Sequence, residues 1–111
     1  MSVTVTTLVP AKIVEAAQTT QYTASNVTAI IDKFTATNFS AAVASLSVNL
    51  VGVSGAPGDE NLVVKTKALQ PGETYLFPEL VGQVLTVGST ISTLTASAGA
   101  INLRVSGRVV T

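Results

Sequence analysis

Ten serines and four lysines are the residues with which nucleophilic chemistry would have to begin in this chain. A serine nucleophile needs a neighbouring base, usually histidine, and the chain has no histidine. It has no cysteine either, which excludes a thiolate nucleophile and a disulfide framework. A serine–lysine pair stays conceivable, but no G-x-S-x-G motif presents a serine on a sharp turn. We therefore predict no catalytic residue.

Paired carboxylates would be the alternative route to hydrolysis, as in glycosidases. The candidates are Asp32, Glu60, Glu73 and Glu79. Such enzymes also need a sugar-binding cleft, and only five aromatic residues are available to line one. Glu73 and Glu79 stand at a predicted turn and a predicted helix start, where free backbone N–H groups stabilise an acid. These acids are therefore expected to be structural.

Metal and phosphate sites are also not expected. The segment Asp59–Asn61 offers oxygen ligands for Ca²⁺ but lacks the D-x-D-x-D-G spacing that wraps one ion. The loop glycines Gly52, Gly55 and Gly58 are not followed by the G-K-[ST] of a phosphate-binding loop. We predict no cofactor and no metal.

Charge is scarce and balanced. Six basic and six acidic residues give a net charge of zero, which gives no reason to expect a nucleic-acid partner. No apolar run is long enough for a membrane helix, so no membrane partner is expected. Only 11% of the residues are charged, while valine occurs seventeen times and threonine sixteen times. Either the chain is a monomer of low charge, or much of its surface faces other subunits, which we favour.

The elements that must position these residues are predicted to be strands, because β-branched residues suit a pleated surface and apolar residues alternate along the chain. Residues 12–17 fit either a short strand or a helical turn, and Pro78 could open a single helical turn. Residues 52–61 form a loop, and Pro71-Gly72 suits a type II turn. The predicted strands cover residues 3–9, 18–24, 27–37, 42–50, 62–69, 74–77, 90–98 and 100–110.

The predicted fold is all-β: a two-sheet antiparallel β-sandwich or jelly roll of seven to eight strands, with at most one or two helical turns. It is a single domain over residues 1–111, in which residues 1–19 form an N-terminal arm or edge strand. The predicted core consists of Ile30, Phe34, Leu46, Val48, Leu50, Val64, Ile91, Leu103 and Val105.

Asp32 falls on the apolar face of its predicted strand. A buried carboxylate needs a partner, and Arg104 or Arg108 on the last strand could supply one. The other interpretation is that the strand bulges there and exposes Asp32.

The N-terminal strand is predicted to build an intermolecular contact. Val3, Val5 and Val9 share one face, the strand ends at Pro10, and no charged residue protects it as a sheet edge. Its partner is either the chain's own sheet, a sister subunit or another protein. We predict a homo-oligomer, dimer or trimer, with Val3, Val5, Thr7 and Val9 at the contact.

A spaced pattern over residues 20–111 runs through Tyr22–Ala24, Ala29–Asp32, Asn38, Leu69, Pro71–Thr74, Leu85, Gly88–Ile91 and Val105–Gly107. This pattern resembles small β-sandwich structural proteins of tailed-phage virions. Such proteins tend to carry an acid where Ser89 and Arg108 stand here.

The resemblance implies a non-enzymatic virion component, assembled in the host cytoplasm, whose partners are the major capsid protein or other virion proteins. The expected role is capsid decoration (cement) on the outside of the head. A neck, collar or tail-fibre module is the first alternative. A carbohydrate- or cell-surface-binding module is the second, and it would use an exposed aromatic such as Tyr22 or Tyr75 beside a concave site.

Overall fold

The computed structural model describes residues 2–111; Met1, the first residue of the predicted N-terminal segment 1–19, lies outside the described residues. The described chain forms nine strands and one short 3-10 turn. These elements are β1 (Val3–Ile13), β2 (Thr19–Thr23), β3 (Thr28–Asn38), β4 (Ala44–Val51), η1 (Asp59–Asn61), β5 (Leu62–Leu69), β6 (Thr74–Tyr75), β7 (Val84–Leu85), β8 (Thr90–Thr95) and β9 (Ile101–Val110).

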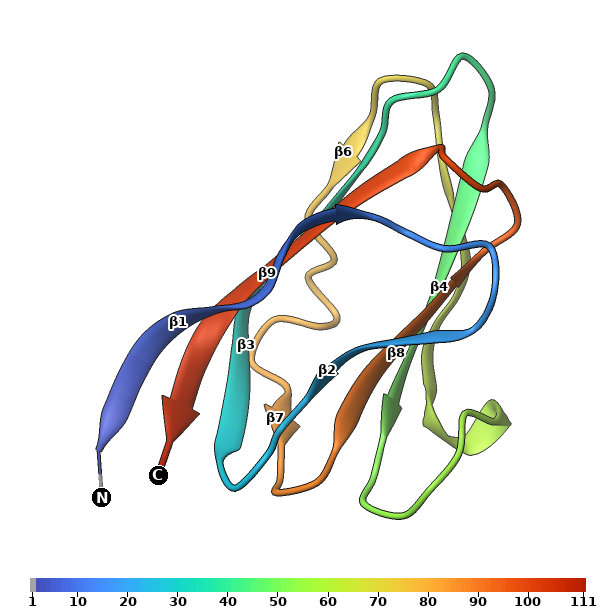
Figure 1. Ribbon diagram of the computed structural model, residues 1–111. Coiled ribbons are helices and arrows are strands. Elements are labelled where there is room, and N and C mark those ends of the chain that lie inside the picture. The colour runs from blue at the N-terminus through green and yellow to red at the C-terminus, as the bar shows by residue number, and fades with distance from the viewer. Residues whose placement is uncertain (1) are drawn as a thin grey trace.

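The strands form two antiparallel sheets packed against each other (Figure 1). One sheet has the order β1-β9-β3-β6, with β7 also paired to β3, and the other has the order β2-β8-β4-β5. Because β6 and β7 both pair with β3, they are two pieces of one interrupted strand. Counted so, the pairs β1–β9, β2–β8, β3–β6/β7 and β4–β5 are those of a long hairpin rolled into a jelly roll. The predicted two-sheet fold is confirmed.

One hydrophobic core fills the space between the sheets. Its largest fully buried side chains include Phe34, Phe77, Leu46, Ile91 and Leu103. Most of the predicted core is confirmed, because alternation along β4, β8 and β9 puts every second side chain inside.

Ile30 and Leu50 are only partly buried, so their assignment to the core was wrong. Leu50 packs against the rim of the core. Ile30 points outward because β3 shifts its register against β9 between Ile31 and Lys33. Before this bulge Ala29 and Ile31 face the core, and after it the alternation resumes on the opposite parity.

The prediction for β1 was wrong in two respects. The strand does not end at Pro10 but continues to Ile13, since a proline is tolerated on an edge strand. Val3 and Val5 do not share a face with Val9, because the register shifts between Thr7 and Val9 and again before Lys12. Of the predicted segment 1–19, residues 3–13 form β1, which lies along β9 as the edge strand of its sheet.

Two further predictions concern the turns at Pro71-Gly72 and at Pro78. Gly72 has φ +78°, and the Glu73 N–H donates to the Gln70 carbonyl at 3.0 Å, which confirms the type II turn after Pro71. Pro78 opens no helix; successive turns carry the chain from β6 to β7 and place Leu80 in the core.

Gly107 fixes the distance between β9 and β3. A Cβ at this position would collide with the backbone carbonyl oxygen of Ile30 and would lie 3.0 Å from Cδ1 of Leu8. Only glycine therefore fits at this point of the sheet. The close approach lies beside the register shift in β3 that turns Ile30 outward.

Candidate interaction surface

The four predicted contact residues lie in two different environments. Val3 and Val5 are 57% and 81% exposed, and Thr7 is exposed as well. Val9 is 1% exposed and belongs to the core, so its side chain cannot contact a partner. The candidate surface on β1 therefore reduces to Val3, Val5 and Thr7.

A row of three apolar residues and one arginine crosses the outer face of the five-stranded sheet from β1 to β7. Val5 lies opposite Arg108, Arg108 opposite Ile30, and Ile30 opposite Val84. Facing residues on neighbouring strands point to the same side of a sheet, so these four side chains form one row. Val84 is 54% exposed, and Arg108 supplies the single charge in the row.

Arg108 of this row binds Asp32. Both interpretations of Asp32, an arginine partner and a bulge that exposes it, are confirmed in part. The bulge in β3 exposes the carboxylate, and Arg108 pairs with it through two donors, Nε at 2.9 Å from Oδ2 and Nη2 at 2.8 Å from Oδ1. The hydrogen bond and charge of Asp32 raise the pKa of the Arg108 guanidinium. An exposed pair adds little to folding stability, but it leaves the row without net charge.

A hollow of about 410 Å³ opens beside this pair on the same sheet. It is lined by Asp32, Lys33, Leu76, Pro78 and Val81. Leu76 and Val81 are exposed although they are apolar. The hollow therefore combines exposed apolar side chains with the charged groups of Asp32 and Lys33.

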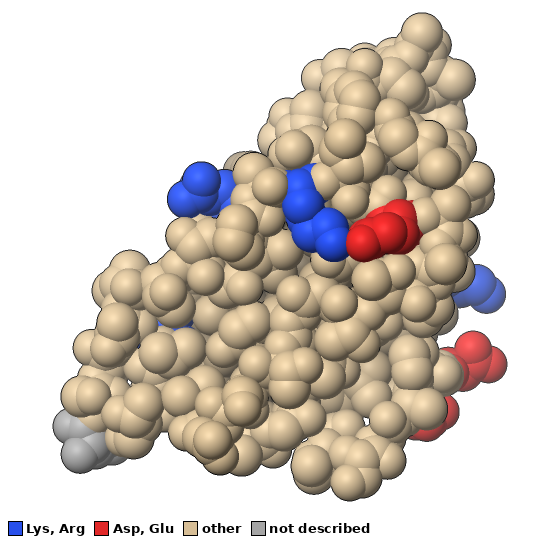
Figure 2. Space-filling model, in the orientation of Figure 1, with Lys and Arg blue, Asp and Glu red and all other residues tan. Residues whose placement is uncertain are grey.

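Figure 2 shows a different side of the molecule, the one along which the chain turns from β1 into β2, and charged side chains are few there as well. One basic side chain lies against one acidic side chain near the middle of the face, and uncharged side chains cover most of what surrounds them. Isolated apolar residues are normal on a protein surface, whereas large contiguous apolar patches often mark contact sites.

The outer face of the four-stranded sheet is different, because polar side chains are bonded to one another there. Buried Asn49 accepts a hydrogen bond from Gln18 and donates to Asn61 at 2.8 Å and to the carbonyl of Gly58 at 3.1 Å. Gln18 also donates to Ser92 at 2.7 Å. This network ties the loop before β5 to the sheet.

A groove of about 240 Å³ lies over that network. Its rim carries Asp59 and Lys65, and its walls include Leu62 and Leu94. The sequence prediction missed this groove. A sequence signal for it exists in β4, where Ser47 and Asn49 alternate with apolar residues.

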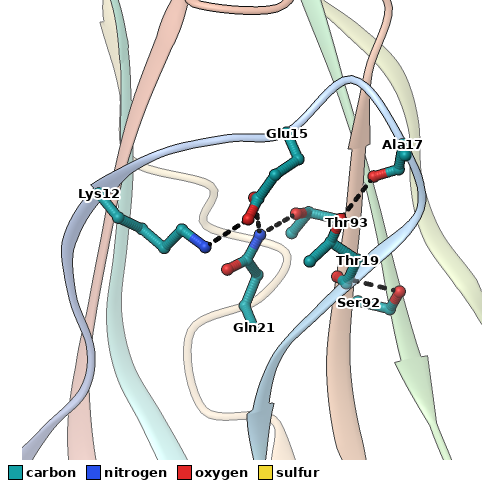
Figure 3. Close-up of polar contacts among 7 residues, drawn as sticks. All are labelled: Lys12, Glu15, Ala17, Thr19, Gln21, Ser92 and Thr93. Atoms are coloured by element: carbon teal, nitrogen blue, oxygen red, sulfur yellow. Dashed lines mark hydrogen bonds and ion pairs between the residues drawn. The ribbon is translucent and has the colours of Figure 1, made fainter.

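A third polar cluster lies where β1 leaves its sheet and the chain turns toward β2 (Figure 3). Lys12 donates to Glu15 at 2.8 Å, and Gln21 donates to Glu15 and to Thr93, each at 2.9 Å. The hydrogen bonds from Lys12 and Gln21 lower the pKa of Glu15 to about 2. Oε1 of Gln21 is buried and has no hydrogen-bond partner among the described residues.

Two of the acids considered for chemistry accept hydrogen bonds from within the chain. Glu73 accepts a hydrogen bond from the backbone N–H of Gln70 at 2.8 Å, as expected for an acid at a turn, whereas Glu79 accepts one from Tyr75 at 3.3 Å. Among residues 2–111, no three acidic, cysteine or histidine side chains gather as a metal site would require.

The two tyrosines considered for ligand binding do not line either hollow. Tyr22 packs against the core, and burial raises its pKa. The ring of Tyr75 lies between Phe77, at a centroid distance of 4.7 Å, and the Lys67 ammonium, 4.4 Å from its centroid. Both rings therefore have structural partners within the chain.

The chain matches no protein-family model, no curated protein and no solved structure. Within the part of the chain that the structure describes, no helix has the length and apolar character needed to cross a membrane.

Proposed function

We propose that this protein is a non-enzymatic structural component of a tailed-phage virion, a decoration (cement) protein that binds the major capsid protein on the outside of the head. The observation that supports the proposal is the outer face of the five-stranded sheet. Val3, Val5 and Val84 are exposed on it, and its Asp32–Arg108 pair is already neutralised. Such a face loses little by leaving water and gains from contact with another protein.

The proposed mechanism is the addition of buried area across subunit junctions. Burying apolar surface stabilises a contact by roughly 25 cal/mol per Å². A protein that binds only the assembled shell also shifts the assembly equilibrium toward the shell by mass action. Neither effect requires a catalytic side chain.

The same face would serve a neck, collar or tail-fibre module, so the experiment must separate these locations. We would delete the gene from the phage that encodes it and compare the particles with the wild type. Decoration predicts that the protein is detected by mass spectrometry in purified wild-type heads. It also predicts that mutant heads form with tails but release DNA at a lower temperature.

Two results would contradict the decoration role. Absence of the protein from purified particles would rule out a virion component. Mutant heads of unchanged heat resistance, combined with missing tails or fibres, would move the protein to the neck or the tail.

The groove on the four-stranded sheet supports a second candidate, a carbohydrate-binding module. Gln18, Asp59 and Lys65 place amide, carboxylate and ammonium groups around the apolar side chains of Leu62 and Leu94. No aromatic ring lines it, and its buried amides already have partners. Titration of the ¹⁵N-labelled protein with host surface glycans tests this candidate: shifts confined to these residues, lost in Lys65→Ala, would support it over decoration.

A further inference from the structure

The free edge of β1 carries the strongest further inference. β9 is the only described strand that pairs with β1, so the opposite edge of β1 is open. In Figure 1, β1 forms the outermost ribbon beside β9 at the N-terminal end. An open strand edge presents unpaired N–H and C=O groups that can pair with another strand.

The register between β1 and β9 identifies the residues whose backbone groups point to that open edge. Ser2 and Thr111 exchange two backbone hydrogen bonds, at 3.3 and 3.0 Å. In an antiparallel pair such residues alternate with residues whose backbone groups point away. Val3, Val5 and Thr7, opposite Val110, Arg108 and Ser106, are therefore the residues with outward N–H and C=O groups.

We propose that two copies of the chain associate through this edge, antiparallel, with Val5 on the two-fold axis. Val5 then pairs with Val5 of the second copy, and Val3 pairs with Thr7. Each of these residue pairs exchanges two backbone hydrogen bonds, so every outward group from Val3 to Thr7 is satisfied. The contact is isologous and joins the two five-stranded sheets into one continuous sheet.

The charge and local geometry of β1 suit a second copy of the chain and limit the length of the contact. No charged residue occurs between Ser2 and Ala11, so the antiparallel strands bring no like charges together. The open edge ends at the register shift after Thr7, and Pro10 follows with no N–H to donate. The pairing therefore spans Val3–Thr7 and closes after two copies, which selects a dimer over a trimer. The inference is independent of the virion proposal.

The test places a charged side chain on the two-fold axis of the dimer. In Val5→Lys, two ammonium groups face each other directly and Arg108 lies beside each, which should raise the dimer dissociation constant about tenfold or more. Adding Val5→Glu should restore dimers, because a lysine then faces a glutamate. Native mass spectrometry with ¹⁵N-labelled Val5→Lys distinguishes the mixed dimer from either homodimer.

A matched control uses the same sheet away from the edge. Val84 is 54% exposed on the same outer face, so Val84→Lys should leave the dimer intact. Both variants should keep the wild-type free energy of unfolding, because both side chains are exposed. The expected result is a dimeric wild type, a dimeric Val84→Lys and a monomeric Val5→Lys that regains partners when mixed with Val5→Glu.

Three results would overturn the proposal. The first is a wild-type chain that sediments at its monomer mass of 11.3 kDa at high micromolar concentration. The second is a Val5→Lys variant that associates as tightly as the wild type. The third is loss of association in Val84→Lys alone, which would move the contact from the edge to the sheet face.

Discussion

The two halves of β1 differ both in sequence and in surroundings. From Val3 to Thr7 the strand is straight and uncharged and exposes its valines, whereas from Leu8 to Ile13 it is bulged, contains Pro10 and buries Leu8 and Val9. Both halves pair with β9. The second half of this edge strand is protected by bulges, a proline and a charged residue, and the first half has none of these.

The second half also ends in the polar cluster around Glu15, which connects the edge of one sheet to the edge of the other. Lys12 and Gln21 approach this carboxylate from the two edge strands. The first half has no such connection. We therefore expect the second half to contribute to the fold and the first half to association, and each prediction below tests that division.

The largest effect is expected at Gly107, on the strand that supports both halves. Gly107→Ala forces a methyl group onto the carbonyl of Ile30, and overpacking of this kind costs about 3 kcal/mol of unfolding free energy. Urea unfolding measures it. Ser106→Ala, on the adjacent outward position, should change stability by no more than about 0.5 kcal/mol. Equal effects of the two substitutions would show that β9 and β3 are less closely packed than described.

Truncation of one side chain in each half compares the halves directly. Leu8→Ala should cost about 2–3 kcal/mol, because Leu8 is 6% exposed, whereas Val5→Ala should cost less than about 0.5 kcal/mol. Both are measured by urea unfolding at a protein concentration low enough to keep the chain monomeric. A large loss in Val5→Ala would mean that the first half also belongs to the folding core.

The smallest effect concerns Glu15 and pH. Its pKa in the folded chain is about 2, below the ordinary value of 4.5. The folded state therefore favours the ionised form of this carboxylate. The resulting contribution to the free energy of unfolding is complete above pH 4.5 and is lost as the pH falls toward 2. The difference in unfolding free energy between wild type and Glu15→Gln should shrink over that range. Lys12→Met should flatten the same pH dependence, and an unchanged profile would contradict the assigned contact.

Much of the fold could be predicted from the sequence because alternation reports burial wherever a strand is regular. This holds for β4 and β9, in which Leu46, Leu103 and Val105 were assigned correctly to the core. It fails at bulges, since one extra residue reverses the face of everything beyond it. Ile30 and Val9 were misplaced for this reason.

The candidate surface could be predicted only in part. An uncharged N-terminal strand indicated an open edge, and three of its four assigned residues are exposed. The groove network of Gln18, Asn49 and Ser92 could not be predicted, because its members come from three strands or loops that only the topology brings together.

The most direct test of the open edge is amide hydrogen exchange of β1, followed by NMR at low and high protein concentration. The N–H groups of Thr4 and Thr6 point toward β9 and should be protected at both concentrations. Those of Val3, Val5 and Thr7 should exchange freely in the dilute monomer and become protected as the dimer forms. Free exchange of all three at millimolar concentration, with Thr4 and Thr6 still protected, would contradict pairing through this edge.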